Sequence, residues 1–97
     1  MFVFPSLCEG FGIPLVEAFS MGCPVACSRI PPFEEVTEDS AVYFDPTDTD
    51  SIYDCVKELL LHATLRRELA DRGFERARAF SWTRSAELTA RCYLKML

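Results

Sequence analysis

The sequence has little of what builds a metal centre or a disulfide framework. It contains a single histidine, His62, and its five cysteines form no C-x-x-C pair. No spacing matches a zinc site, and the odd cysteine count argues against a disulfide framework. We therefore expect no metal, no cofactor and reduced thiols, with Cys27 and Cys55 as small residues of the core. His62 is expected to stabilise the last carbonyls of a helix.

Long apolar runs are also missing, because charged or turn-forming residues interrupt each one well short of the roughly 18 residues that a membrane span needs. No basic segment precedes an apolar stretch at the N-terminus, as it would in a secretory signal peptide. The share of hydrophobic residues, 49% of 97 residues, is too high for a disordered chain. These features predict one small soluble domain in the cytoplasm.

Basic residues are scarce in the first 60 positions, which hold eleven acids against Arg29 and Lys57. A net charge of −5 gives no basic face for a nucleic-acid backbone, so we expect no nucleic-acid partner. Residues 61–97 reverse the balance, with eight bases against four acids. Two interpretations are open: a solvated charged helix surface, or a peripheral contact with anionic lipid headgroups or an acidic partner.

Short apolar segments alternate with helical patterns along the chain. Strands are predicted at 1–5, 24–28 and 41–44, helices at 13–21, 51–62, 65–79 and from Ser81 as N-cap to 97, and one helical turn within 30–40. This order is typical of βαβ units, so the predicted fold class is α/β, with three short parallel strands and flanking helices. Three strands are about half of a doubly wound, Rossmann-like sheet, and they leave an edge open. We therefore expect part of a larger domain that self-associates or is marginally stable alone.

The helical patterns of the C-terminal half each predict one apolar face. Apolar residues recur at helical spacing in two sets: Ile52, Val56, Leu59 and Leu60 in the first helix, and Leu69, Ala70, Phe74 and Ala77 in the second. We expect both sets to point into the core, with the arginines of the second helix facing outward.

The segment between the first strand and the first helix carries the functional chemistry. It lies beyond the carboxyl end of a parallel strand, where open α/β sheets bind ligands. Gly10 and Gly12 let the backbone approach a ligand closely, and free N–H groups within 12–15 favour a phosphate. Glu9 and Glu17, the latter expected in the first helical turn, can accept hydrogen bonds from sugar and ribose hydroxyls. On these residues alone, a structural turn followed by a charged helix start is the favoured interpretation, and ligand binding is the alternative.

The segment from Glu9 to Glu17, EGFGIPLVE, resembles the E-x7-E motif of retaining glycosyltransferases of the group 1 (family 4) type. The similarity continues through 21–26, 35–36 and 43–46 and ends at 76–82, so it covers nearly the whole chain. It implies the GT-B architecture, in which two Rossmann-like domains face each other across a cleft. Residues 1–97 would form part of the C-terminal, donor-binding domain, with 81–97 as its terminal helix.

The resemblance also implies a reaction and the residues that perform it. The reaction would be transfer of a glycosyl group from a nucleotide sugar to an acceptor with retention of configuration and without a metal. Glu9, the expected catalytic residue, would bind hydroxyls of the donor sugar, and Glu17 would bind the ribose. The other expected donor-binding residues are Gly10, Phe11, Gly12, Ile13, Leu15 and Val16.

Several positions depart from the family pattern. Ile30–Glu34 replaces a loop of small residues, so that corner is expected to differ, and no arginine lies in a segment that matches the diphosphate-binding motifs. The acceptor would bind a missing N-terminal domain, without which we expect no activity. The alternative is a non-catalytic module that binds a nucleotide sugar, or binds a protein through the open sheet edge.

Overall fold

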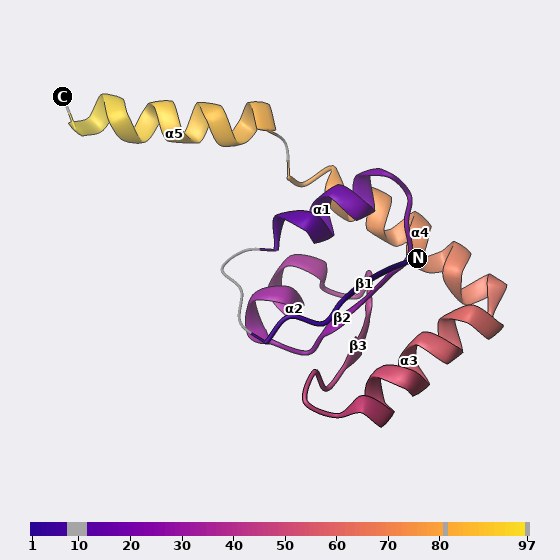
Figure 1. Cartoon of the computed structure of the whole chain (residues 1–97). Coiled ribbons are helices and arrows are strands. Elements are labelled where there is room, and N and C mark those ends of the chain that lie inside the picture. The colour runs from indigo at the N-terminus through magenta and orange to yellow at the C-terminus, as the bar shows by residue number, and fades with distance from the viewer. Residues whose placement is uncertain (8–11, 81, 97) are drawn as a thin grey trace.

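The structure is a computed structural model of the chain. It describes residues 1–7, 12–80 and 82–96, without the side chains of 82–86 and 96. Along the chain the elements are β1 (Phe2–Phe4), α1 (Ile13–Ser20), β2 (Val25–Ser28), α2 (Pro31–Thr37), β3 (Val42–Phe44), α3 (Thr49–Leu61), α4 (Ala63–Ala77) and α5 (Trp82–Met96). Figure 1 shows their arrangement around the sheet.

The predicted parallel sheet is confirmed. The strands lie in the order β1-β2-β3, and both neighbouring pairs are parallel. In this register Phe4 is opposite Cys27, and Ser28 is opposite Phe44. The carboxyl ends of the strands therefore share one edge, where the Ser28 hydroxyl donates a hydrogen bond to the Phe4 carbonyl at 3.3 Å.

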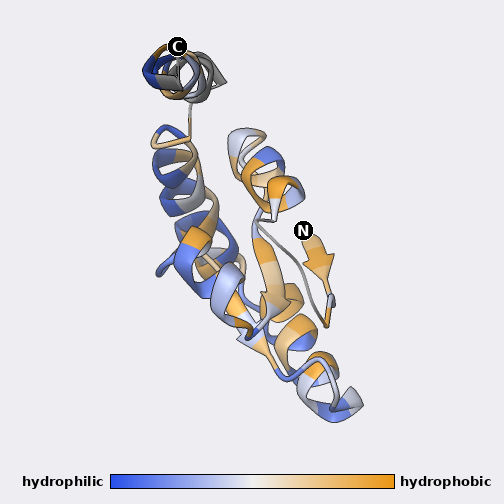
Figure 2. Cartoon of the chain, turned by 90° about the vertical axis from the view of Figure 1, so that its left-hand side faces the viewer, coloured by the Kyte–Doolittle hydropathy of each residue, from blue (hydrophilic) through white to orange (hydrophobic). Residues whose placement is uncertain are grey.

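Side chains alternate between the two faces of the sheet, as the strand period requires. On one face the core consists of Leu15, Phe19, Val25, Cys27, Phe33 and Ala41, and on the other of Ala26, Phe44, Leu59 and Leu69. Helices α1 and α2 thus cover one face, and α3 and α4 cover the other. In Figure 2 the strands are hydrophobic almost throughout, whereas polar residues gather on the helices. Cys27 is fully buried as predicted, while Cys55 is half-buried.

A glycine inside α4 allows this helix to lie against α1. A Cβ added to Gly73 would lie 2.6 Å from Phe19 Cδ1, closer than packed carbon atoms approach. The prediction that the next residue, Phe74, points inward is wrong, because 51% of its surface is exposed. Leu60 was likewise expected in the core, but it is 61% exposed, and the adjacent Leu59 is fully buried. Neighbouring residues on a helix point about 100° apart, so only one of each pair faces the interior.

Helix boundaries differ from the predicted ones where a cap or a proline sets them. Asp48 is the N-cap of α3: its Oδ1 accepts hydrogen bonds from the amides of Asp50 and Ser51, at 2.9 and 3.3 Å. The helix therefore starts at Thr49, earlier than the predicted residue 51. Helix α2 has seven residues rather than a single turn. It can begin at its two prolines because the first helical positions need no N–H partner.

The side chain of Arg66, rather than that of His62, donates to the last carbonyls of α3. The Arg66 guanidinium donates to the carbonyls of Leu59 and Leu60 at 2.6 and 2.7 Å. His62 lies between α3 and α4 as their shared cap residue, and its side chain makes no hydrogen bond that caps α4. A cation does stabilise this helix end, as expected, but it comes from the next helix.

Helix α5 extends away from the rest of the described chain (Figure 1). The side chains described on it, from residues 87 to 95, are all exposed. Ser81, the predicted N-cap of this helix, lies outside the described residues. Of the described helices, none is both long enough and apolar enough to traverse a membrane.

Candidate functional site

The predicted site lies where the chain leaves β1 and enters α1. Glu9, Gly10 and Phe11 fall outside the described residues, so their predicted roles are neither supported nor contradicted. The structure does describe the other five predicted residues, which form the start of α1: Gly12, Ile13, Leu15, Val16 and Glu17. The amino end of this helix is at the edge of the sheet where the strands have their carboxyl ends, which is where open α/β sheets bind ligands.

Gly12 directs the chain into α1. It is the N-cap residue, its φ is +85°, and its carbonyl accepts a hydrogen bond from the Leu15 amide at 3.0 Å. A Cβ here would lie 3.2 Å from Leu15 Cδ1 and 3.2 Å from Phe33 Cδ1 and Cε1. Both the left-handed backbone and the tight surroundings favour glycine at this position.

The two faces of α1 have different surroundings. Leu15 and Phe19, one turn apart, are fully buried in the core. Ile13 and Glu17, also one turn apart, lie on a different face, where Ile13 is 44% exposed and Glu17 is exposed. Val16 is half-buried. Of the predicted donor-binding side chains, Ile13 and Glu17 are therefore the ones brought together in solvent, whereas the Leu15 side chain serves the core.

Glu17 lies in the second turn of α1. Because Gly12 is the N-cap, Glu17 is the fifth helical residue, and the first turn contains no acidic residue. The expectation that it lies in the first turn is wrong, and the helix dipole therefore gives only a weak reason for its presence, since that effect fades beyond the first turn. In the parts of the chain that the structure describes, no hydrogen bond or ion pair engages its carboxylate.

Arg29 is a cation at the same edge that the predicted site did not include. It follows β2 directly; its Nη1 lies 3.1 Å from Glu34 Oε1, and its guanidinium lies 4.8 Å from the centre of the Tyr43 ring. The sequence did contain a signal for this residue, because Arg29 directly follows the predicted strand 24–28 and so lies at the carboxyl end of that strand. Burial of the neighbouring Tyr43 hydroxyl raises its pKa, so the phenol is neutral at physiological pH.

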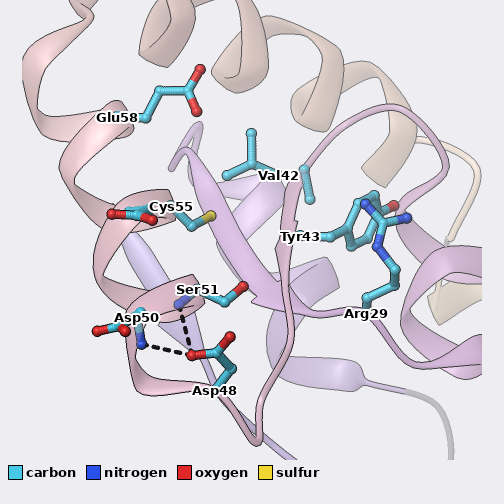
Figure 3. Close-up of a pocket in the computed structure, with 10 residues that line it drawn as sticks. Arg29, Val42, Tyr43, Asp48, Asp50, Ser51, Cys55 and Glu58 are labelled. Atoms are coloured by element: carbon cyan, nitrogen blue, oxygen red, sulfur yellow. Dashed lines mark hydrogen bonds between the residues drawn. The ribbon is translucent and has the colours of Figure 1, made fainter.

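A separate groove of about 680 Å³ runs between β3 and α3 (Figure 3). It is lined by four carboxylates, those of Asp48, Asp50, Asp54 and Glu58, together with Arg29, Ala41, Val42, Tyr43, Ser51 and Cys55. None of the five described residues of the predicted site lines it. The carboxylates make it unfavourable for the phosphates of a nucleotide, and burial raises the pKa of Cys55, which keeps its thiol neutral. Among the described residues, no cluster of three or more side chains is arranged to hold a metal ion.

Comparison with known proteins identifies related sequences over nearly the whole chain. The family described as "Glycosyl transferases group 1" matches residues 1–76. O-antigen chain mannosyltransferase B of Escherichia coli is 38% identical over 92 residues, which are 95% of this chain and 24% of that protein. MMP alpha-(1->4)-mannosyltransferase of Mycolicibacterium hassiacum is 36% identical over 97 residues, covering 96% of this chain and 24% of that protein.

A solved structure has the same arrangement of strands and helices. Sucrose-phosphate synthase from Thermosynechococcus elongatus matches with a TM-score of 0.89 and 27% identity, over 97% of this chain and 24% of that one. The chain therefore spans about a quarter of the length of each of these three proteins. The expected fold, part of a GT-B glycosyltransferase, is confirmed.

Proposed function

Since the chain belongs to the group 1 glycosyltransferases, we propose that it binds the nucleotide-sugar donor of a retaining glycosyltransferase. The mannosyltransferases among its relatives make mannose the first sugar to test. The acceptor then binds a separate N-terminal domain, and the glycosyl group is transferred in the cleft between the two. The chain alone would be inactive, because it supplies only the donor side.

One observation carries this proposal. Gly12, with its left-handed backbone, starts α1 at the carboxyl edge of the sheet, and the exposed Glu17 carboxylate follows on the same face as Ile13. Of the free N–H groups expected within 12–15, Pro14 has none and the Leu15 amide already donates to the Gly12 carbonyl. The Ile13 amide at the first helical position has no acceptor within the helix, so it can donate to a phosphate oxygen. An exposed carboxylate one turn further along can accept hydrogen bonds from a ribose. This combination matches the polar groups of a nucleotide sugar.

The proposed roles follow the family motif. Glu9 binds hydroxyls of the donor sugar, and the backbone from Gly10 to Ile13 holds the sugar and the diphosphate. Glu17 binds the ribose, and Val16 lines the nucleotide side. Leu15 acts from the core, where its buried side chain fixes the first turn of α1. Such a site accelerates transfer by positioning the donor and stabilising the leaving diphosphate.

Binding of GDP-mannose and UDP-glucose to the full-length protein, measured by calorimetry, tests this assignment. Glu17→Ala should weaken binding of the preferred donor by about 1–3 kcal/mol, the value of hydrogen bonds to a charged group. Glu58→Ala, which removes an exposed carboxylate from the separate groove, is the matched control and should change Kd by less than about two-fold.

Each outcome decides between sites or functions. An unchanged Kd for Glu17→Ala would remove this residue from the donor site. A loss confined to Glu58→Ala would move the site to the groove between β3 and α3. Failure of both donors to bind would favour the alternative of a non-catalytic protein-binding module. The anomeric configuration of the first product, read by NMR, tests retention.

A further inference from the structure

We infer that Phe33 of α2 is a positioning residue for donor binding, because its ring holds the end of β1 and the start of α1 at a fixed separation. This inference rests on the proposed function. The motif between β1 and α1 does not include Phe33, which lies in the 30–34 segment where the sequence departs from the family pattern.

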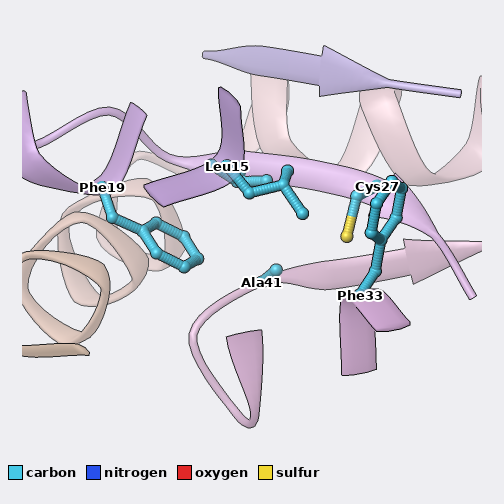
Figure 4. Close-up of a cluster of buried hydrophobic side chains, with 6 residues drawn as sticks. Leu15, Phe19, Cys27, Phe33 and Ala41 are labelled. Atoms are coloured by element: carbon cyan, nitrogen blue, oxygen red, sulfur yellow. The ribbon is translucent and has the colours of Figure 1, made fainter. Parts of the chain in front are cut away.

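The ring of Phe33 contacts both ends of the connection that carries the motif. It stacks on Phe4, the last residue of β1, with 5.0 Å between ring centres and 24° between ring planes. It also lies against Gly12, the N-cap of α1, since a Cβ there would be 3.2 Å from two of its ring atoms. Phe33 is fully buried, and Figure 4 shows it entering the core beside Cys27. One side chain therefore sets the distance between the point where the chain leaves the sheet and the point where it enters α1.

The carboxyl end of α2 is anchored away from the motif. Arg76 of α4 donates to the Val36 carbonyl at 2.8 Å and lies 3.4 Å from a carboxylate oxygen of Glu38. The Thr37 hydroxyl donates to the carbonyl of Phe33 itself at 2.8 Å. Because these contacts come from α4 and from within α2, the ring is a fixed support against which Gly12 is placed.

The shape of the ring matters for this role as well as its volume. Leucine at position 33 would keep the site apolar but would lose the planar surface that stacks on Phe4 and packs on the backbone of Gly12. We expect the start of α1 to shift, carrying the Ile13 amide and Glu17 with it. Donor affinity should fall even though neither group has been altered, because small displacements of binding groups are costly.

The experiment compares Phe33→Leu with Phe44→Leu in the full-length protein. Phe44 is also buried, but it belongs to the core on the opposite face of the sheet, so it matches the packing loss without touching Gly12 or Phe4. A 1 Å misplacement of reacting groups can cost roughly 100-fold in rate. For binding we expect a smaller effect, and Phe33→Leu should raise the Kd for the preferred nucleotide sugar about ten-fold. Phe44→Leu should stay within about two-fold, although both lower the melting temperature.

A second measurement reads the contact itself without the donor. The Phe33 ring next to Gly12 should shift the Gly12 α-proton resonances by its ring current, and Phe33→Leu should abolish this shift while Phe44→Leu keeps it. If Phe33→Leu prevents folding, Phe33→Met replaces it in both measurements. Equal effects of the two leucine variants on Kd would overturn the positioning role. If the wild-type protein binds neither GDP-mannose nor UDP-glucose, the proposed function fails first and this role fails with it.

Discussion

Gly73 offers a test of how closely α1 and α4 pack, because two opposing effects of Gly73→Ala can be compared. Alanine has a higher helix propensity than glycine, which favours the folded state by about 0.8–1 kcal/mol. The added Cβ would lie 2.6 Å from Phe19 Cδ1, and Phe19 is fully buried, so its ring cannot turn into solvent. Overpacking of this kind costs about 1–3 kcal/mol. The packing cost should prevail, with a net loss of about 1 kcal/mol.

The assay is urea and thermal unfolding followed by circular dichroism. A loss of about 1 kcal/mol corresponds to a drop of about 4–8 °C in Tm for a domain of this size. A double-mutant cycle isolates the cause: in a Phe19→Leu background the ring is gone, so Gly73→Ala should become neutral or stabilising. If Gly73→Ala stabilises the protein that retains Phe19, or if the cycle shows no coupling, the close contact does not limit this position and the reasoning is refuted.

Three further predictions concern the helix cap, the buried thiol and the open sheet. Asp48→Ala should lower the free energy of unfolding by about 1 kcal/mol through loss of the cap, whereas Asp48→Asn should keep most of that stability because asparagine also caps helices. Equal losses for the two variants in urea titrations would contradict the capping role. Burial raises the pKa of the Cys27 thiol to about 12 in the folded protein, whereas the unfolded chain keeps the ordinary pKa near 9. The stability that this thiol contributes is therefore complete below pH 9. Between pH 9 and 12 the free energy of unfolding should fall by up to about 1.4 kcal/mol per pH unit, because the unfolded chain loses the proton first. Cys27→Ala should remove that part of the alkaline slope, and parallel pH profiles of the two proteins under reducing conditions would count against it. The isolated chain, with its outer strands β1 and β3 lacking further neighbours in the described sheet, should self-associate or melt at low temperature; a sharp monomeric transition above about 65 °C would disprove this.

The three parallel strands and their flanking helices could be predicted from the sequence because short apolar runs alternate with helical patterns along the chain. The period alone does not distinguish adjacent residues at the border of a helix face, which is why Leu60 and Phe74 were misplaced. Phe74 also depends on Gly73, whose importance lies in its contact with Phe19 from another part of the chain. The same limit applies to Arg66, since a pattern within α3 cannot reveal a cation supplied by α4.

The candidate site could be predicted only in part, for a related reason. Gly12 and Glu17 belong to a local motif, so the sequence alone indicated both. The turn in which Glu17 lies depends on which residue is the N-cap, and the structure assigns that position to Gly12. The contact of Phe33 with Gly12 arises only once α2 has folded on to the sheet, and no local pattern contains it.

Under the proposed function, helix α1 combines a structural and a ligand-facing role within eight residues, and its helical period keeps the two apart. Leu15 and Phe19 point into the core, while Ile13 and Glu17 point away from it. A substitution on the inner face can therefore alter donor binding only by moving the helix, whereas one on the outer face acts on the ligand directly. Phe33 belongs to the first kind, even though it lies on another helix, because it acts on the placement of Gly12. Substitution of a core residue such as Leu15 should therefore lower both stability and donor affinity, whereas substitution of Glu17 should lower donor affinity without a matching loss of stability.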